Sequence, residues 1–311
     1  MAQGLAVVVA ASTIAFVLLH VAPGDPFNSL GEGMTSAMRA QLRHQWGLDQ
    51  PLAQQYLNWL WNAARGDFGS SSLLDRPVFE VIMSKLPNTM FLMGLALSSS
   101  IAFGITLGAW QGARVGTRSD RILSTLSLAV YSAPEFWLGV ALLLLFSQHW
   151  QLLPAGDMTS PEYRYFSTVE RIVDRARHLV LPWLTLTLIG TAVFARFQRA
   201  AMRDSMGEPF VRTARAKGLP ESRVRGHALR ASLLPVITLG GLLFPALLGG
   251  AVLVERVYSW PGMGSLLVDA IESRDYLLVT GTVVVASAMT ALGTLLADVA
   301  RTVADPRVAR S

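Results

Sequence analysis

One acidic residue, Glu135, lies inside a long apolar stretch of the sequence, Ile122–Phe146, and follows a proline. A carboxylate within a membrane span is costly to desolvate, so such a group usually faces a cavity or a polar partner. Pro134 frees a backbone carbonyl and bends a helix at this point. Two interpretations stay open for Pro134 and Glu135: the lining of a polar pathway, or a structural hydrogen bond to another subunit.

The sequence lacks the residue patterns of common catalytic and metal sites. Neither of its two lysines, Lys85 and Lys217, lies in a Gly-x-x-x-x-Gly-Lys-Ser/Thr phosphate-binding loop. Its five histidines form no i, i+4 pair, and Gly-x-Ser-x-Gly is absent. The absence of cysteine excludes disulfides, cysteine-ligated zinc and thiol catalysis. We therefore predict a chain that is not an enzyme and carries neither a metal nor a cofactor of its own.

The composition indicates a membrane protein. Of the 311 residues, 52% are hydrophobic and only 15% are charged, whereas soluble domains carry about 25% charged residues. The mean hydropathy of +0.42 points the same way, and so apolar a chain is not disordered.

Six apolar stretches are about as long as a membrane-spanning helix requires. We therefore predict an all-α membrane protein with six transmembrane helices. The first stretch is longer than the apolar region of a signal peptide and follows no basic leader, so we interpret it as a true span. The predicted spans are Gly4–Ala22, Thr89–Gln111, Ile122–Phe146, Leu179–Ala195, Ala231–Val254 and Leu277–Ala297.

The basic residues indicate how the spans are oriented. The connections Gly112–Arg121 and Arg196–Arg230, together with the end Asp298–Ser311, hold 15 basic residues in 59, whereas the other connections hold 11 in 120. Cytoplasmic loops are enriched in Arg and Lys, so we predict that both termini are cytoplasmic. The net charge of +5 then reflects topology, and we expect no nucleic-acid partner.

The long outer segment Pro23–Asn88 is expected to form two helices. The first covers Thr35–Trp46, and the second covers Pro51–Arg65, with Pro51 at its start and Gly66 after its end. Tryptophans in this segment suit a membrane interface. Two interpretations stay open: a helical hairpin packed on the outer membrane surface, or a platform for an outside partner.

The inner segment Arg196–Arg230 contains a short helix, which begins at Pro209 and ends at Gly218. Spacings of i, i+4 and i+7 place Phe210, Ala214 and Lys217 on one face, and a second helix can restart at Pro220. An exposed apolar residue, a small residue and a cation on one face are typical of a docking element. The alternative is a solvated basic loop that only sets the topology.

The sequence resembles the permease subunits of binding-protein-dependent ABC importers, in the dipeptide and oligopeptide branch. The family pattern Glu-Ala-Ala, three residues, then Gly has its counterpart in Arg212-Thr213-Ala214 followed by Gly218, so the family Glu is an Arg here and the first Ala a Thr. Other segments resemble the family in the same order along the chain: Pro23-Gly-Asp-Pro26, Gly47-Leu-Asp-Gln-Pro51, Gly66-Asp-Phe-Gly69, Leu86-Pro-Asn-Thr89, Ser132-Ala-Pro-Glu-Phe-Trp-Leu-Gly139, His227-Ala-Leu-Arg-Ala-Ser-Leu-Leu-Pro235 and Trp260-Pro-Gly-Met-Gly264.

The resemblance implies a type I ABC importer permease fold in the bacterial inner membrane. It implies a first helix with an extracytoplasmic segment in residues 1–85, a permease domain in 86–301 with a coupling loop at 196–230, and a cytoplasmic tail at 302–311. The implied partners are a second, homologous permease subunit, two ATPase domains that hold ATP and Mg²⁺, an extracytoplasmic substrate-binding protein, a peptide substrate and membrane lipid.

The resemblance also assigns roles to residues. The ATPase-coupling residues would be Glu208, Pro209, Phe210, Val211, Arg212, Thr213, Ala214, Arg215, Ala216, Lys217, Gly218 and Leu219, with Ala214 against the ATPase. Pro134 and Glu135 would line the pathway, where Glu135 could meet a peptide amino terminus. The binding protein would dock on Trp260, Pro261, Gly262, Met263 and Gly264.

Two other substrates and one other class of transporter stay open as alternatives. Related permeases handle nickel chelates or glutathione instead of peptides. A self-sufficient secondary transporter would show paired broken helices and several intramembrane charges, whereas this sequence has one such acid and one clear proline break.

Overall fold

The computed structural model describes residues 2–21, 49–71, 73–248 and 252–304, and its fold is almost entirely helical. The predicted helix Thr35–Trp46, the Pro23–Pro26 motif and residues 305–311 of the tail lie outside these ranges. The elements are α1 (Ala2–Val21), α3 (Leu52–Ala64), the antiparallel strands β1 (Ser70–Ser71) and β2 (Arg76–Pro77), α4 (Val78–Gly112), α5 (Arg118–Ser132), α6 (Glu135–Leu143), the π-helical turn η2 (Leu144–His149), the 3-10 helix η3 (Pro161–Tyr165), α7 (Thr168–Gly207), α8 (Pro209–Ala216), α9 (Glu221–Leu248), α10 (Val252–Val257), α11 (Met263–Glu272) and α12 (Tyr276–Ala304).

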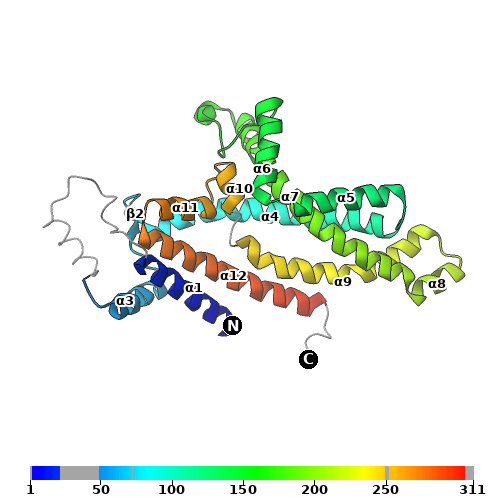
Figure 1. Ribbon diagram of the computed structural model, residues 1–311, viewed down its shortest axis with the longest axis horizontal. Coiled ribbons are helices and arrows are strands. Elements are labelled where there is room, and N and C mark those ends of the chain that lie inside the picture. The colour runs from blue at the N-terminus through cyan, green and yellow to red at the C-terminus, as the bar shows by residue number, and fades with distance from the viewer. Residues whose placement is uncertain (1, 22–48, 72, 249–251, 305–311) are drawn as a thin grey trace.

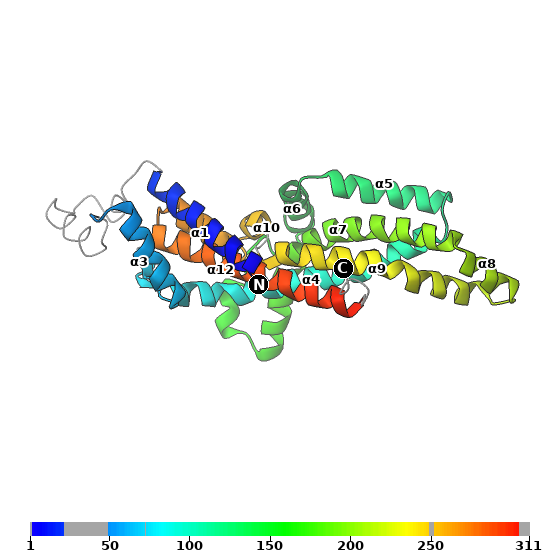
Figure 2. The same ribbon diagram turned by 90° about the horizontal axis from the view of Figure 1, so that it is seen from below.

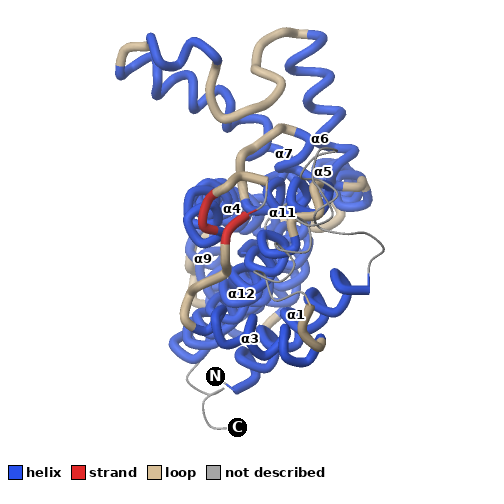
Figure 3. The backbone as a smooth tube through the Cα atoms, turned by 90° about the vertical axis from the view of Figure 1, so that its left-hand side faces the viewer, coloured by secondary structure: helices blue, strands red, loops and turns tan. Residues whose placement is uncertain are grey.

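The long helices α4, α7, α9 and α12 run along the long axis of the molecule (Figure 1). Helix α1 lies beside α12 near one end, with α3 close to it, and α8 lies at the opposite end, beyond the end of α12 (Figure 2). Helix α6 and the N-terminal part of α7 project from one side of this bundle (Figure 3). The sequence therefore folds into an elongated bundle with a lateral arm.

Three helices in the described ranges are long and apolar enough to cross a membrane: Val78–Gly112, Thr168–Gly207 and the Tyr276–Leu295 part of α12. The pair Arg118–Ser132 and Glu135–His149 passes the same test as a unit. These four coincide with predicted spans, although α4 and α7 extend well past the predicted limits. Of the other two predicted spans, α1 is apolar over Ala6–Val17, and α9 ends at Leu248 beside residues that are not described.

The third predicted span is not one continuous helix. The chain is extended at Ala133 and Pro134, and the helices on either side are bent by 104° relative to each other. Proline lacks the backbone N–H that would continue the ladder, and the residue before it avoids the helical region. The bend expected at Pro134 is thus a full break between two helices, and Glu135, which was expected near the middle of a span, begins α6.

Helices α4 and α7 pack unusually closely because α4 presents glycines to α7. At Gly108 a Cβ atom would come within 2.5 Å of the Ala195 carbonyl oxygen, and at Gly112 within 2.6 Å of the Met202 Cβ atom. Gly104 faces Phe194 in the same way. Small residues four apart are a common means of bringing membrane helices into contact. This contact fixes α7 against the centre of the bundle.

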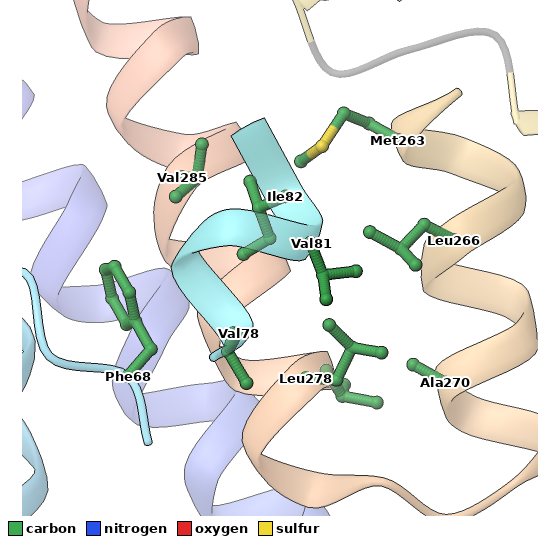
Figure 4. Close-up of a cluster of buried hydrophobic side chains, with 10 residues drawn as sticks. Phe68, Val78, Val81, Ile82, Met263, Leu266, Ala270, Leu278 and Val285 are labelled. Atoms are coloured by element: carbon green, nitrogen blue, oxygen red, sulfur yellow. The ribbon is translucent and has the colours of Figure 1, made fainter. Parts of the chain in front are cut away.

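A buried apolar cluster closes the end of the bundle opposite α8. It joins the start of α4 to α11 and α12, with Phe68 packed against it (Figure 4). Its labelled members are Phe68, Val78, Val81, Ile82, Met263, Leu266, Ala270, Leu278 and Val285. The cluster thus ties the start of α4 to the two helices that end the described chain.

Candidate functional site

Helix α8 has the ends that its sequence predicts. Pro209 occupies the first turn, and Gly218 follows the helix with a φ of +74°. The Gly218 N–H donates to the Arg215 carbonyl (2.9 Å), and the Leu219 N–H donates to the Ala214 carbonyl (3.2 Å). This pair of bonds is a Schellman cap, which a left-handed glycine makes possible. The next helix, α9, begins at Glu221, as the sequence predicts.

Helix α8 is seated on the rest of the chain through its Val211–Ala214 side. Val211 is fully buried and Ala214 is 9% exposed, and both pack with Met202 of α7 and Val224 of α9. The expectation that Ala214 faces a partner ATPase is therefore wrong. A two-turn helix must bury its apolar stripe to remain folded, and the i, i+3 pair Val211–Ala214 is that stripe.

The side of α8 next to this stripe is open. Phe210 is 41% exposed, and Thr213 and Lys217 are exposed one and two turns later. Phe210 and Lys217 thus share a free face, as predicted, but Thr213 takes the place expected for Ala214. The remaining surface holds Arg212 and Arg215; the latter pairs with Glu221 at 2.7 Å and links α8 to α9.

A buried ion pair lies between α8 and the break at Pro134. Arg199 of α7 donates two hydrogen bonds to the Asp120 carboxylate at the start of α5, with distances of 2.6 and 2.8 Å. The Asp120 side chain is 1% exposed and that of Arg199 is 28% exposed. The pair fastens α5, which leads to the break, to the helix that leads to α8.

Glu135 lies at the first turn of α6, half-buried, and no side-chain hydrogen bond or ion pair joins its carboxylate to the described part of the chain. One turn later, the Gly139 carbonyl accepts a hydrogen bond from the Tyr258 hydroxyl (2.8 Å), which also contacts Thr185 of α7 (2.9 Å). The base of α6 is thus held by α7 and by the residue that follows α10, while the acid beside it has no fixed partner among the described residues.

The Trp260–Gly264 motif is largely buried. Trp260 and Met263 are 1% and 3% exposed, Gly262 and Gly264 are also buried, and Pro261 is half-buried. The Trp260 indole N–H donates to the Asn88 carbonyl (3.3 Å), and the Asn88 amide donates to the Pro261 carbonyl (2.9 Å). Docking of a binding protein on this motif stays a prediction, and the buried side chains would support such a surface more than form it.

A buried carboxylate, which we name the Glu255 clamp, holds this motif in place. Glu255 accepts hydrogen bonds from the Thr89 hydroxyl (2.7 Å) and from the backbone N–H groups of Gly264 (2.7 Å) and Ser265 (3.0 Å). The acceptor satisfies free N–H groups in the first turn of α11 and complements its dipole. A Cβ atom at Gly262 would overlap this carboxylate, so the glycine permits the close approach.

No pattern in the sequence indicated the structural roles of Glu255, Thr89, Asp120 and Arg199. Glu255 follows directly after an apolar stretch and precedes two closely spaced glycines, which is the one local signal of a buried acid there. No group of three or more His, Cys, Asp or Glu residues that could hold a metal occurs within the described ranges.

Comparison with family models covers nearly the whole length of the chain. Residues 104–310 match the model described as "Binding-protein-dependent transport system inner membrane component". Residues 1–93 match the model of the corresponding N-terminal part, "Binding-prot-dependent transport system membrane comp, N-term". The second model thus includes α1, α3 and the start of α4, and the first includes α8.

Several characterised proteins are similar over almost their entire length. The oligopeptide transport system permease protein AppB of Bacillus subtilis is 36% identical over 298 residues, and the dipeptide transport system permease protein DppB of Escherichia coli K12 is 37% identical over 314. The di/tripeptide transport system permease protein DppB of Pseudomonas aeruginosa is also 37% identical. Each match covers 95% of this chain and 93% of the relative. The chain therefore belongs to the family of inner membrane components of binding-protein-dependent transport systems.

Proposed function

We propose that this chain is the permease subunit of an ATP-driven importer of dipeptides or oligopeptides in the bacterial cytoplasmic membrane. The observation that carries the proposal is the similarity to proteins named as peptide permeases over 95% of the chain. The test is uptake of labelled di- and tripeptides by proteoliposomes that contain the reconstituted complex, with ATP inside and binding protein outside. Uptake of a nickel chelate or of glutathione, without peptide uptake, would mean that the substrate is that compound and not a peptide.

The proposed topology has six spans and two cytoplasmic termini, with α5 and α6 as a broken third span. Residues 1–85 form the first span and its extracytoplasmic segment, residues 86–301 form the permease domain, and residues 302–311 form the tail. The density of Arg and Lys in the inner connections supports this orientation. It also places α8 in the cytoplasm, at the end of the bundle that extends past α12 (Figure 1).

Single cysteines test this topology cleanly because the chain has none of its own. Ser70 and Arg225 are both exposed. We expect Ser70→Cys to react with an impermeant maleimide added outside intact cells, and Arg225→Cys to react only after the membrane is permeabilised. The opposite pattern would mean that the orientation is inverted.

In this proposal α8 is the coupling helix, and its free face with Phe210, Thr213 and Lys217 contacts one ATPase domain. ATP and Mg²⁺ then belong to the ATPase domains, and the permease contributes no catalytic residue. The seat formed by Val211 and Ala214 supports this role, because a displacement of α8 would move α7 and α9 with it. The Asp120–Arg199 pair would carry the motion of α7 to α5.

The lateral arm is the proposed contact with the second, homologous permease subunit. Phe136 and Trp137 on α6 are 49% and 57% exposed, and Val169 and Ile172 on α7 are 70% and 65% exposed. Exposed apolar side chains of this size are typical of an interface with protein or lipid. Glu135 lies beside Phe136, so this arrangement places the acid near the boundary between the two permease subunits, where a pathway would form.

The Glu135→Gln variant tests the pathway role. We expect a complex of normal composition with peptide uptake reduced several-fold, because glutamine keeps the shape and removes the charge that would meet a peptide amino terminus. Glu162→Gln, at an exposed position on η3, is the matched control and should leave uptake unchanged. Wild-type uptake by Glu135→Gln would mean that Glu135 has only a structural role and does not line the pathway.

A further inference from the structure

Helix α3 is amphipathic without being charged. No Asp, Glu, Lys or Arg occurs between residues 50 and 64, and none of the helix residues is buried in the protein. Its side chains form three stripes along the axis. The half-buried stripe, which includes Tyr56 and Trp59, faces the protein, and the other two stripes are exposed.

The two exposed stripes differ in polarity. One contains Leu57 and Trp61, one turn apart, which are 62% and 61% exposed. The other contains Gln54, Asn58 and Asn62, also one turn apart and exposed. An apolar stripe beside a polar stripe is the pattern of a helix that lies along a boundary between oil and water.

The contact between α3 and α1 defines where along the length of α1 the helix α3 lies. The Tyr56 hydroxyl is hydrogen-bonded to the Thr13 hydroxyl at 2.6 Å, and the Phe16 ring lies 5.3 Å from the Tyr56 ring and 5.8 Å from the Trp59 ring. Thr13 and Phe16 precede the end of α1 at Val21 by eight and five residues. At a rise of about 1.5 Å per residue, α3 touches α1 about 7–12 Å below its outer end.

We propose that α3 lies inside the outer leaflet of the membrane. Leu57 then lies among the lipid acyl chains, and Trp61 lies where the acyl chains meet the headgroups. This inference rests on the proposed topology, in which α1 is the first span and its end at Val21 is extracytoplasmic. A depth of 7–12 Å falls within the half of a hydrocarbon core about 30 Å thick. The apolar stripe of α3 then continues the lipid-facing surface of α1, where Ile14 and Val17 are 59% and 49% exposed.

The end of α3 fits the headgroup layer. The Arg65 guanidinium stacks on the Trp61 ring, 4.4 Å from its centroid. Tryptophan and arginine together are typical of the level at which acyl chains meet phosphates. An aqueous platform for the binding protein would present charged side chains along the helix, and α3 has none between Pro51 and Ala64.

Spin labels at adjacent residues test the proposal. Leu57→Cys and Asn58→Cys are labelled with a nitroxide in the complex in lipid nanodiscs, and collision rates with oxygen and with a water-soluble nickel chelate are measured. We expect the label at residue 57 to collide mainly with oxygen, which partitions into lipid, and the label at residue 58 to collide several-fold more with the chelate. High access of the chelate to residue 57, lost only when loaded binding protein is added, would overturn the proposal in favour of a protein platform.

A matched pair of acidic substitutions gives an independent measurement. Leu57→Asp should lower the unfolding temperature in nanodiscs, because an aspartate is costly in hydrocarbon, whereas Asn58→Asp should leave it unchanged. Equal effects of the two changes would contradict a leaflet location. Neither experiment depends on transport, so absence of peptide uptake by the wild-type complex would refute the proposed function while leaving the accessibility pattern to be judged by itself.

Discussion

The Gly218→Val variant should insert into the membrane normally and lose most of its peptide uptake. Gly218 has a φ of +74°, which a β-branched residue adopts only with strain of about 1–3 kcal/mol. No other group lies within 4 Å of a Cβ atom there, so the effect is conformational. The turn that caps α8 would open and release α8 from its seat. The measurement is ATPase stimulation by loaded binding protein, together with uptake, in proteoliposomes.

Gly226→Val is the matched control for this experiment. Gly226 lies in α9, has ordinary helical backbone angles and has no group within 4 Å of a Cβ atom. Its replacement should leave both activities near wild type. If Gly218→Val behaves like this control, the segment serves only to set topology.

Ala214→Trp should also uncouple the complex, because it would disturb the packing that holds α8 on α7 and α9. Because Ala214 packs against α7 and α9, a tryptophan would overfill the seat of α8 instead of blocking a partner. Overpacking costs about 1–3 kcal/mol. Phe210→Ala provides the contrast: it leaves the seat intact and should weaken recruitment of the ATPase alone. Equal thermal stability of Ala214→Trp and wild type would contradict the buried seat.

The second large effect is expected for Asp120→Asn, which should destabilise the permease by about 2 kcal/mol, since it leaves the half-buried Arg199 without its counter-charge. Glu221→Asn is the matched control, because its pair with Arg215 is about half exposed and such pairs contribute about 1 kcal/mol or less. The measurement is the unfolding midpoint of each variant in the same detergent. A double-mutant cycle with Arg199→Gln isolates the interaction itself. Additive losses from the two single changes would mean that the pair is not coupled.

Local signals predicted the ends of elements well. Pro209 and Gly218 bound α8, and Pro51 and Gly66 flank α3, because the backbone preferences of proline and glycine act over a few residues. The break at Pro134 is local in the same sense. Its angle of 104° was not predictable, since it depends on how α6 packs against α7 and α10.

Contacts between residues that are far apart in the chain could not be predicted from the sequence. Which side of α8 turns inward depends on Met202 and Val224, in neighbouring helices, so Ala214 was assigned to the wrong side. Glu255 counted as the first residue of an outer loop because its partner Thr89 is 166 positions away. Periodicity does not distinguish the faces of the predicted spans, since these segments are apolar all round.

The Glu255 clamp has a consequence for how the protein is made. After Thr89 leaves the ribosome, 166 more residues must be synthesised before its carboxylate acceptor exists, and the backbone donors at Gly264 and Ser265 follow later still. Until then the Thr89 end of α4 lacks the carboxylate that joins it to α11. Synthesis of Thr89 and completion of this part of the fold are thus separated by more than half of the chain's translation.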